Sequence, residues 1–477
     1  MRRRGLLGLL AIGVLGGAGC RVAERHGRSV VFASGAEIQT LNPLLTSHPL
    51  AKQIERYVLL TTLVRYDSSL VARPYLARSW GWSADRRTLT FHLARGVRWE
   101  DGPETTARDV VWTVNAARDP ASGYPRIDDL SNVDWVRNPD DSTVVVRFAR
   151  GQDGIPDVFT DLAILPAHLL DTVPVARMRG AAWNARPIGN GPFRLTRHEA
   201  NRRWVFVVNP AFPLALGGPP QIERFVVVVV DEPTTKLAAL SSGEVDFAGI
   251  QPAHAAFVRR DHHLALIEYP SLQANVIVFN TRRPPFDALR ARAAVSLAID
   301  RSAIVDGYLY GFGIPADRAL DASGLGAATV AGADTAGARR LLGGRRVAFE
   351  LLTVGSGEAP LEQMLQAQLA RAGIDLAIRQ LELSTYLDKL YGPRDFQAAV
   401  LGIGADVGMG YLAVLARLAG MPVGPDPAGA RAIIRDSLPV AFLYYGRGLQ
   451  GANRRVRGVR MDARGELPTI AQWSVAP

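Results

Sequence analysis

Few residues of this chain have types and spacings that could support catalysis. The sequence contains no G-x-S-x-G nucleophile turn, no H-E-x-x-H zinc motif and no Walker A lysine, and its only cysteine is Cys20. The adjacent residues His262 and His263 would point in different directions on a helix or a strand, so they cannot readily chelate one metal ion. We therefore expect no catalytic centre, no metal site and no cofactor.

A glycine-rich segment at residues 402–408 (GIGADVG) is the other candidate for chemistry. It follows a run of apolar residues and superficially resembles a dinucleotide-binding loop, in which phosphates lie at the start of a helix. The third glycine comes one residue late, and no good helix start follows it. We therefore reject a dinucleotide site here.

Residues 88–112 carry the clearest local signals for the elements that would position any site. Apolar residues alternate through 89–93, which is the period of a half-buried strand, and a second short alternation follows at 97–99. Thr106 precedes Asp109 by three residues in an acidic variant of the capping box, so a helix should begin there. These signals predict a hairpin followed by a helix.

Several later segments indicate an α/β protein. The continuous apolar run at 225–230 is typical of a strand covered on both faces. An apolar helical face at 361–372 ends before a glycine, and alternation at 374–378 predicts a strand. Ser384 is expected to cap the next helix, and 396–401 to form another strand.

The composition describes an ordinary globular protein with a basic balance. Of 477 residues, 48% are hydrophobic and 21% charged, and the formal net charge is +10. Only Lys52, Lys236 and Lys389 are lysines among the 55 basic residues, and the arginines are scattered, without regularly interleaved aromatics. We therefore expect no nucleic-acid partner.

The N-terminus predicts export. A basic start at 2–4 precedes a short apolar core at 6–15, which is roughly half the ~20 residues needed to span a bilayer. Small residues then lead to Cys20, in a pattern that resembles a lipoprotein signal, although Gly17 stands where leucine is preferred. The prediction is a periplasmic or cell-surface protein anchored through lipidated Cys20. An ordinary cleavage site that happens to precede a cysteine is the alternative.

Six segments, in this order along the chain, resemble the signatures of family 5 extracellular solute-binding proteins, the oligopeptide- and dipeptide-binding receptors of ABC importers. They are L-N-P-L at 41–44, P-Y-L-A-R-S-W at 74–80, F-x-L-x-x-G-V-x-W-x-D-G-x-x-x-T-A-x-D-V at 91–110, P-I-G-N-G-P-F at 187–193, L-S-S-G-E-V-D at 240–246, and F-N with the block ending at Asp300 in 279–300. Together they cover most of residues 30–310.

The resemblance implies an α/β, two-lobed periplasmic-binding-protein fold (Venus flytrap, type II, cluster C) with an extra β-rich subdomain. The expected parts are a signal peptide at 1–20, lobe I at 21–50, 183–270 and 441–477, the β-rich subdomain at 51–182, and lobe II at 271–440. Lobe II is expected to be shorter than in typical relatives, between Val407 and Leu438. The chain should cross between the lobes near 271–280 and 440–445, which would form a hinge.

The resemblance also implies a ligand clamp. In the family, a G-W-x-A-D segment carries an aspartate that meets the α-ammonium group of a bound peptide, and by position this aspartate is Asp406. A carboxylate in a closed, water-poor cleft pairs strongly with a cation. Ile403 stands in place of the family's tryptophan, which removes an aromatic wall, and the neighbours Gly404 and Ala405 complete the segment. The alternative is that Asp406 merely caps a turn.

The remaining expected ligand contacts lie elsewhere in the chain. Ser47 and His48 follow the L-N-P-L motif where relatives expose a loop to ligand, and Tyr124 stands where an aromatic commonly enters the cleft. Gln273 and Asn275, at the crossover, could offer main-chain groups to an extended peptide by strand addition. For the loop residues and Tyr124, an ordinary surface position is the alternative.

These features predict a non-catalytic receptor that captures a peptide and delivers it to the permease subunits of an ABC importer, as a monomer held to a membrane by its lipid. Two alternatives stay open. The same fold could bind another cargo, such as a metal chelate, haem or a sugar oligomer. A degenerate member with a damaged pocket could act as a sensor or bind a partner protein.

Overall fold

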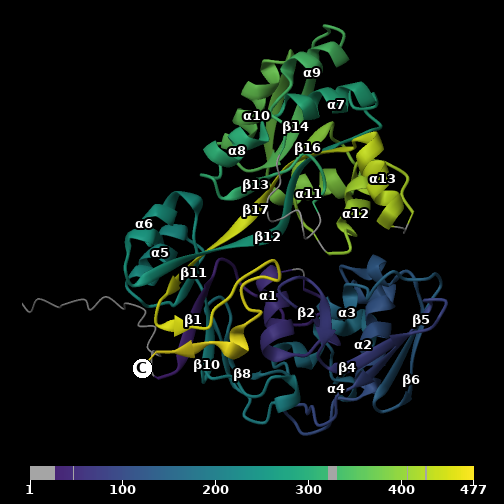
Figure 1. Cartoon of the computed structure of the whole chain (residues 1–477), viewed down its shortest axis with the longest axis vertical. Helices are drawn as coiled ribbons and strands as arrows, with labels where there is room; N and C mark the ends of the chain where they lie inside the picture. Colours follow the sequence, from purple (N-terminus) through teal and green to yellow (C-terminus); the bar gives the residue numbers. More distant parts are fainter. Residues whose placement is uncertain (1–26, 47, 321–329, 406, 425–426, 477) are drawn as a thin grey trace, which may run out of the picture.

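Two lobes joined by a pair of long strands make up the protein (Figure 1). The computed structural model describes residues 27–46, 48–320, 330–405, 407–424 and 427–476. Strands β12 (Leu264–Phe279) and β17 (Val440–Asn453) pair antiparallel and run through both lobes. The 16 residues of β12 span about 50 Å at ~3.3 Å per residue. We call residues 271–440 lobe II and the rest lobe I; the chain passes between them along these two strands, which overlap the predicted crossing segments.

One sheet of eleven strands continues through the molecule in the order β15-β14-β16-β12-β17-β11-β1-β10-β9-β8, with β13 added beside β17. Its lobe I strands are β1 (Ser29–Ser34), β8 (Phe193–Glu199), β9 (Arg203–Val208), β10 (Arg224–Val229) and β11 (Phe247–Gly249). Phe225 and Val227 of β10 pack into one core, while Val226 and Val228 pack into another on the opposite face. The prediction of a strand covered on both faces is confirmed.

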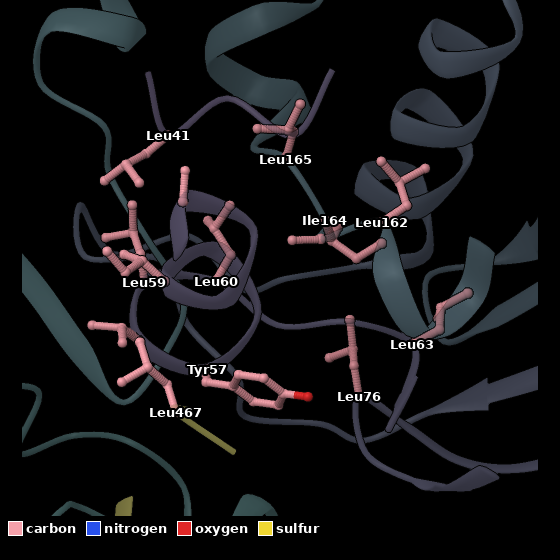
Figure 2. Close-up of a cluster of buried hydrophobic side chains, with 14 of the residues drawn as sticks. Leu41, Tyr57, Leu59, Leu60, Leu63, Leu76, Leu162, Ile164, Leu165 and Leu467 are labelled. Atoms are coloured by element: carbon pink, nitrogen blue, oxygen red, sulfur yellow. The ribbon is translucent and has the colours of Figure 1, made fainter. Parts of the chain in front are cut away.

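The helices of lobe I lie on both sides of this sheet and beside it. Besides several short 3-10 turns, they are α1 (Pro49–Ile54), which continues into the π-helix η1 (Glu55–Leu59), then α2 (Ala107–Arg118), the 3-10 helix η3 (Ile127–Leu130), α3 (Val158–Asp161), α4 (Ala167–Leu170), α5 (Pro233–Ser241) and α6 (Ala255–Arg260). Figure 2 shows the core around η1, where Leu41 from the L-N-P-L motif, Leu162 and Leu467 gather around Tyr57 and Leu59. Stretches far apart in sequence therefore build this lobe together.

A separate antiparallel sheet fills the far end of lobe I. It consists of β4 (Ala77–Trp82), β5 (Thr88–Leu93), β7 (Thr143–Phe148) and β6 (Val133–Asp140), and three short pairs lie elsewhere: β2 (Val64–Tyr66) with β3 (Ala72–Pro74), β18 (Val456–Arg457) with β19 (Ser474–Val475), and β13 (Gly313–Pro315) with β17. The capping box is confirmed, because Thr106 and Asp109 exchange side-chain-to-backbone bonds at the start of α2. The predicted hairpin is wrong: residues 97–99 form only an isolated bridge between Arg98 and Glu104, and β5 pairs with β4 and β7.

Lobe II is an α/β unit with a core on each face of its strands. Its strands are β14 (Val347–Val354), β15 (Ile374–Leu381) and β16 (Ala398–Gly404), and its helices are α7 (Leu289–Ala298), α8 (Arg301–Gly307), α9 (Thr335–Leu341), α10 (Pro360–Ala370), α11 (Leu383–Tyr391), α12 (Tyr411–Leu418) and α13 (Pro427–Ser437). The predicted helix and strands are confirmed within a few residues. The predicted cap is wrong, because Glu382 caps α11 by accepting the N–H groups of Ser384 and Thr385. Among the described residues, no helix is long and apolar enough to cross a bilayer.

The P-I-G-N-G-P motif holds the backbone of lobe I together. A Cβ on Gly189 would lie 2.1 Å from the carbonyl oxygen of Leu59, and one on Gly191 would lie 2.6 Å from the Leu59 carbonyl carbon. Between them, fully buried Asn190 accepts the N–H of Thr61 at 2.9 Å and donates to the Thr105 hydroxyl at 3.0 Å. The motif is therefore glycine-rich because two backbones approach each other closely.

Glu100 connects this motif to residues 91–110. Its Oε1 accepts the Gly189 N–H at 2.8 Å, and burial raises the pKa of Glu100 to about 7 from 4.5. The folded state therefore binds this proton more tightly than the unfolded state, and the resulting stability is present below pH 4.5 and lost as the pH rises through about 7.

Changing Glu100→Gln should remove this pH dependence while keeping an acceptor for Gly189. The variant should be more stable than the native chain at pH 8 by roughly 2 kcal/mol, allowing for partial solvent exposure, with little gain at pH 4.5. Denaturant unfolding of both chains at the two pH values measures the difference. An equal difference at both pH values would contradict the assignment.

Candidate functional site

The edge of lobe II that faces lobe I is built from strand ends. β14 pairs in parallel with both β15 and β16, so the carboxyl ends of all three strands lie at one edge. β16 runs antiparallel to β12, which enters lobe II from lobe I, and this edge is therefore turned toward lobe I (Figure 1). In open α/β sheets, ligands bind outside the carboxyl ends of strands.

The predicted clamp segment lies at this edge. Ile403 is half-buried against the core of lobe II, Gly404 is exposed, and the Ala405 N–H donates to the Leu272 carbonyl at 2.7 Å. The end of β16 is thereby fixed to the crossing strand β12. Asp406 itself lies outside the described residues, as do Ser47 and Cys20.

Gln273 and Asn275 lie next to the clamp segment. They stand opposite Gly404 and Gly402 in the β12–β16 pairing, and a Cβ on Gly402 would lie 3.0 Å from the Gln273 side-chain nitrogen. Strand addition at Asn275 is wrong, because Asn275 pairs with Gly402 of β16 on one side and with Tyr444 of β17 on the other. Gln273 pairs with Gly404 of β16 and is exposed, and the register of the β12–β17 pairing is shifted beside it.

Two predicted contacts in lobe I have roles within the fold. His48 caps α1, since its Nδ1 accepts the Ala51 N–H at 3.3 Å, and burial lowers the pKa of its imidazole. Tyr124 is only 6% exposed and packs in the core of lobe I, where burial raises its pKa well above the ordinary value. The prediction that Tyr124 enters the cleft is therefore wrong.

A partly buried cluster of charges in lobe I was not predicted. Arg56, Arg126 and Lys52 surround Asp161, with Arg126 donating to it at 3.0 Å. Burial alone would raise the pKa of Asp161, but the three cations together hold it below its ordinary value. Glu55 lies beside them at 2% exposure, one of its oxygens has no partner, and burial raises its pKa well above 4.5.

The cluster joins α1, η1 and α3 to the segment before η3. Its members come from separate elements, so no local pattern in the sequence could reveal them.

The paired His262 and His263 also differ from expectation, because their rings lie 3.9 Å apart in the turn before β12. Across the described residues, no group of three His, Cys, Asp or Glu side chains could hold a metal ion.

Solved structures share this fold. The oligopeptide-binding protein AppA from Bacillus subtilis, in complex with a nonapeptide, matches with a TM-score of 0.78 over 94% of this chain and 99% of that chain, at 20% identity. A dipeptide-binding protein from Pseudoalteromonas sp. SM9913, in complex with Met-Leu, matches with a TM-score of 0.75 over 94% and 100% of the two chains, at 18% identity. These similarities establish the two-lobed α/β fold.

Comparison with sequence relatives agrees with the structural comparison. A putative ABC transporter peptide-binding protein of Brucella ovis is 28% identical over 328 residues, and the dipeptide-binding protein of Escherichia coli K12 is 25% identical over 336. Each match covers 66% of this chain and 62% of the relative's own length. The profile described as "Bacterial extracellular solute-binding proteins, family 5 Middle" matches residues 72–416. Since this match covers most of the chain, the protein belongs to the family 5 bacterial extracellular solute-binding proteins.

Proposed function

We propose that this protein is an extracytoplasmic receptor that captures peptides between its lobes and delivers them to the permease of an ABC importer, without catalysing a reaction. Family membership supports a receptor that binds a substrate. The relatives named above are described as peptide-binding proteins, which favours peptides over the other cargoes considered. The receptor acts as a monomer.

The observation that carries the proposal is the two-strand connection between separate cores. Lobe II has its own cores on both faces of its strands, and among the strands of the described residues only β12 and β17 continue the main sheet between the lobes. Two adjacent strands permit rotation of one lobe against the other without unfolding either core. A ligand at the strand-end edge would then be enclosed by closure.

The proposed parts keep the predicted bounds, with lobe I at 21–50, 183–270 and 441–477, the β-rich subdomain at 51–182 and lobe II at 271–440. The separate sheet β4-β5-β7-β6 supports the subdomain. Asp406 is the proposed ammonium partner, supported by the position of Ile403–Ala405 at the strand-end edge. Gln273 and Asn275 contribute side chains from the crossing strand.

Native mass spectrometry of the purified protein tests the proposal. The expected result is a bound mass that is lost on mild denaturation and that fragments as a peptide. Recovery of a metal chelate or a sugar oligomer instead would overturn the peptide assignment and leave the receptor fold intact.

Membrane anchoring gives a further prediction. If Cys20 is lipidated, the multiple acyl chains of a lipoprotein hold the protein stably at a membrane, whereas one chain binds only marginally. Changing Cys20→Ser should therefore move most of the protein to the soluble fraction or leave an unprocessed precursor. Fractionation of both chains decides this. A serine variant that stays with the membrane as the native protein does would refute lipidation.

A further inference from the structure

The two lobes touch through polar groups in this structure. In lobe I, the carboxylate of Asp157 accepts the hydroxyl of Tyr66 from its own lobe. Its other oxygen accepts the N–H of Gly408 from lobe II at 2.7 Å. A single side chain thus connects β2 of lobe I to the turn that follows β16.

A second contact lies on the next helix. Arg417 of α12 donates to the carboxylate of Asp128, in η3 of lobe I, at 2.8 Å. The two side chains are 38% and 71% exposed, so this ion pair is weak and sensitive to salt. Both contacts therefore join lobe I to the short stretch 408–417 of lobe II.

The turn that carries Gly408 is fixed to its own lobe. Met409 adopts a left-handed backbone conformation, with φ of 60°, and its side chain is buried in the core of lobe II at 8% exposure. Such a conformation persists only where the surroundings impose it. The backbone that carries the Gly408 N–H is therefore fixed in position. The hydrogen bond from the Tyr66 hydroxyl orients the carboxylate of its partner, Asp157.

We infer that Asp157 and Asp128 form a clasp with Gly408 and Arg417 that favours closure of the lobes and positions the end of β16 against lobe I. Neither aspartate is among the proposed ligand contacts. The apparent dissociation constant of a ligand for a closed state equals its intrinsic value divided by the closed fraction. The clasp therefore tunes affinity by setting that fraction, a consequence that rests on the proposed function, whereas the effect on closure itself does not.

Distances between the lobes in the ligand-free protein test the clasp. With the only cysteine removed by Cys20→Ser, spin labels at Asp134→Cys in lobe I and Ala367→Cys in lobe II, both at exposed positions, report closure by pulsed electron resonance. Asp128→Arg and Arg417→Asp should each shift the ratio of closed to open molecules by roughly three- to tenfold toward open. The double exchange Asp128→Arg with Arg417→Asp should restore the native distribution.

Matched variants separate the clasp from general damage. Asp153→Arg, at another exposed aspartate of the same lobe, should leave the distances unchanged. Asp157→Ala should favour the open state, while Asp157→Asn, which keeps an acceptor for Gly408, should retain most of the closure. Unchanged distances in both single reversals, or a double exchange that fails to restore them, would overturn the clasp. A failed peptide assignment would leave these ligand-free results untouched.

Discussion

Replacing Asp406 by alanine should weaken binding of a free-amine peptide by at least a hundredfold. If Asp406 holds the α-ammonium group, the variant leaves that cation enclosed without its partner. Removing one side of a buried ion pair costs about 3–5 kcal/mol, and ~1.4 kcal/mol corresponds to a factor of ten. Titration calorimetry with a peptide identified from the native protein measures the loss.

Two controls separate charge from shape. Asp406→Asn should lose nearly as much affinity despite its similar size, because the charge is what pairs with the ammonium group. The N-acetylated form of the same peptide should bind the native protein poorly and lose little more on mutation. If the free-amine peptide binds the alanine variant as tightly as the native protein, the ammonium clamp does not operate here.

Signals contained within one element were predicted well from the sequence. The capping box at Thr106 and Asp109 needs only residues three apart, and both of its bonds form in the structure. The apolar run of β10 required packing on both faces, and its alternate side chains enter two different cores. In each case the physical cause lies within a few residues of the pattern.

Predictions that depended on distant partners were less successful. The alternation at 97–99 has the period of a strand, but β5 already has β4 and β7 on its two sides, so no edge remains for it. Ser384 is a good capping residue by type, yet Glu382 occupies the capping position. Which strand takes an edge depends on the rest of the sheet, and boundaries shift by a residue or two with tertiary packing.

The candidate site shows the same division. The resemblance led to the strand-end segment 403–405, and the structure places that segment at the edge facing lobe I. Tyr124 has the residue type of a cleft wall, but it is buried in the lobe I core, and the charges around Asp161 come from separate elements. Burial and convergence of this kind are properties of the whole fold, and no single stretch of sequence contains them.

The aspartate that ends the L-S-S-G-E-V-D motif should be a major source of stability for lobe I. Asp246 is fully buried and receives two bonds from Arg455 at 2.7 Å, and it also accepts the Val31 N–H at 2.9 Å. Arg455 in turn donates to the Ser29 carbonyl at 2.8 Å. The pair therefore ties the first strand to β11 and to the segment after β17.

Changing Asp246→Ala should lower the free energy of unfolding of lobe I by about 3–5 kcal/mol, because a partly buried guanidinium and a backbone N–H lose their acceptor. All eight tryptophans lie in lobe I, so their fluorescence during denaturation reports this lobe alone. The exposed pair Arg28 and Glu223 supplies the control, since Glu223→Ala should cost at most about 1 kcal/mol. If Asp246→Ala costs no more than this control, the buried pair is not what secures the first strand, and the close backbone packing of β1 between β10 and β11 would have to suffice.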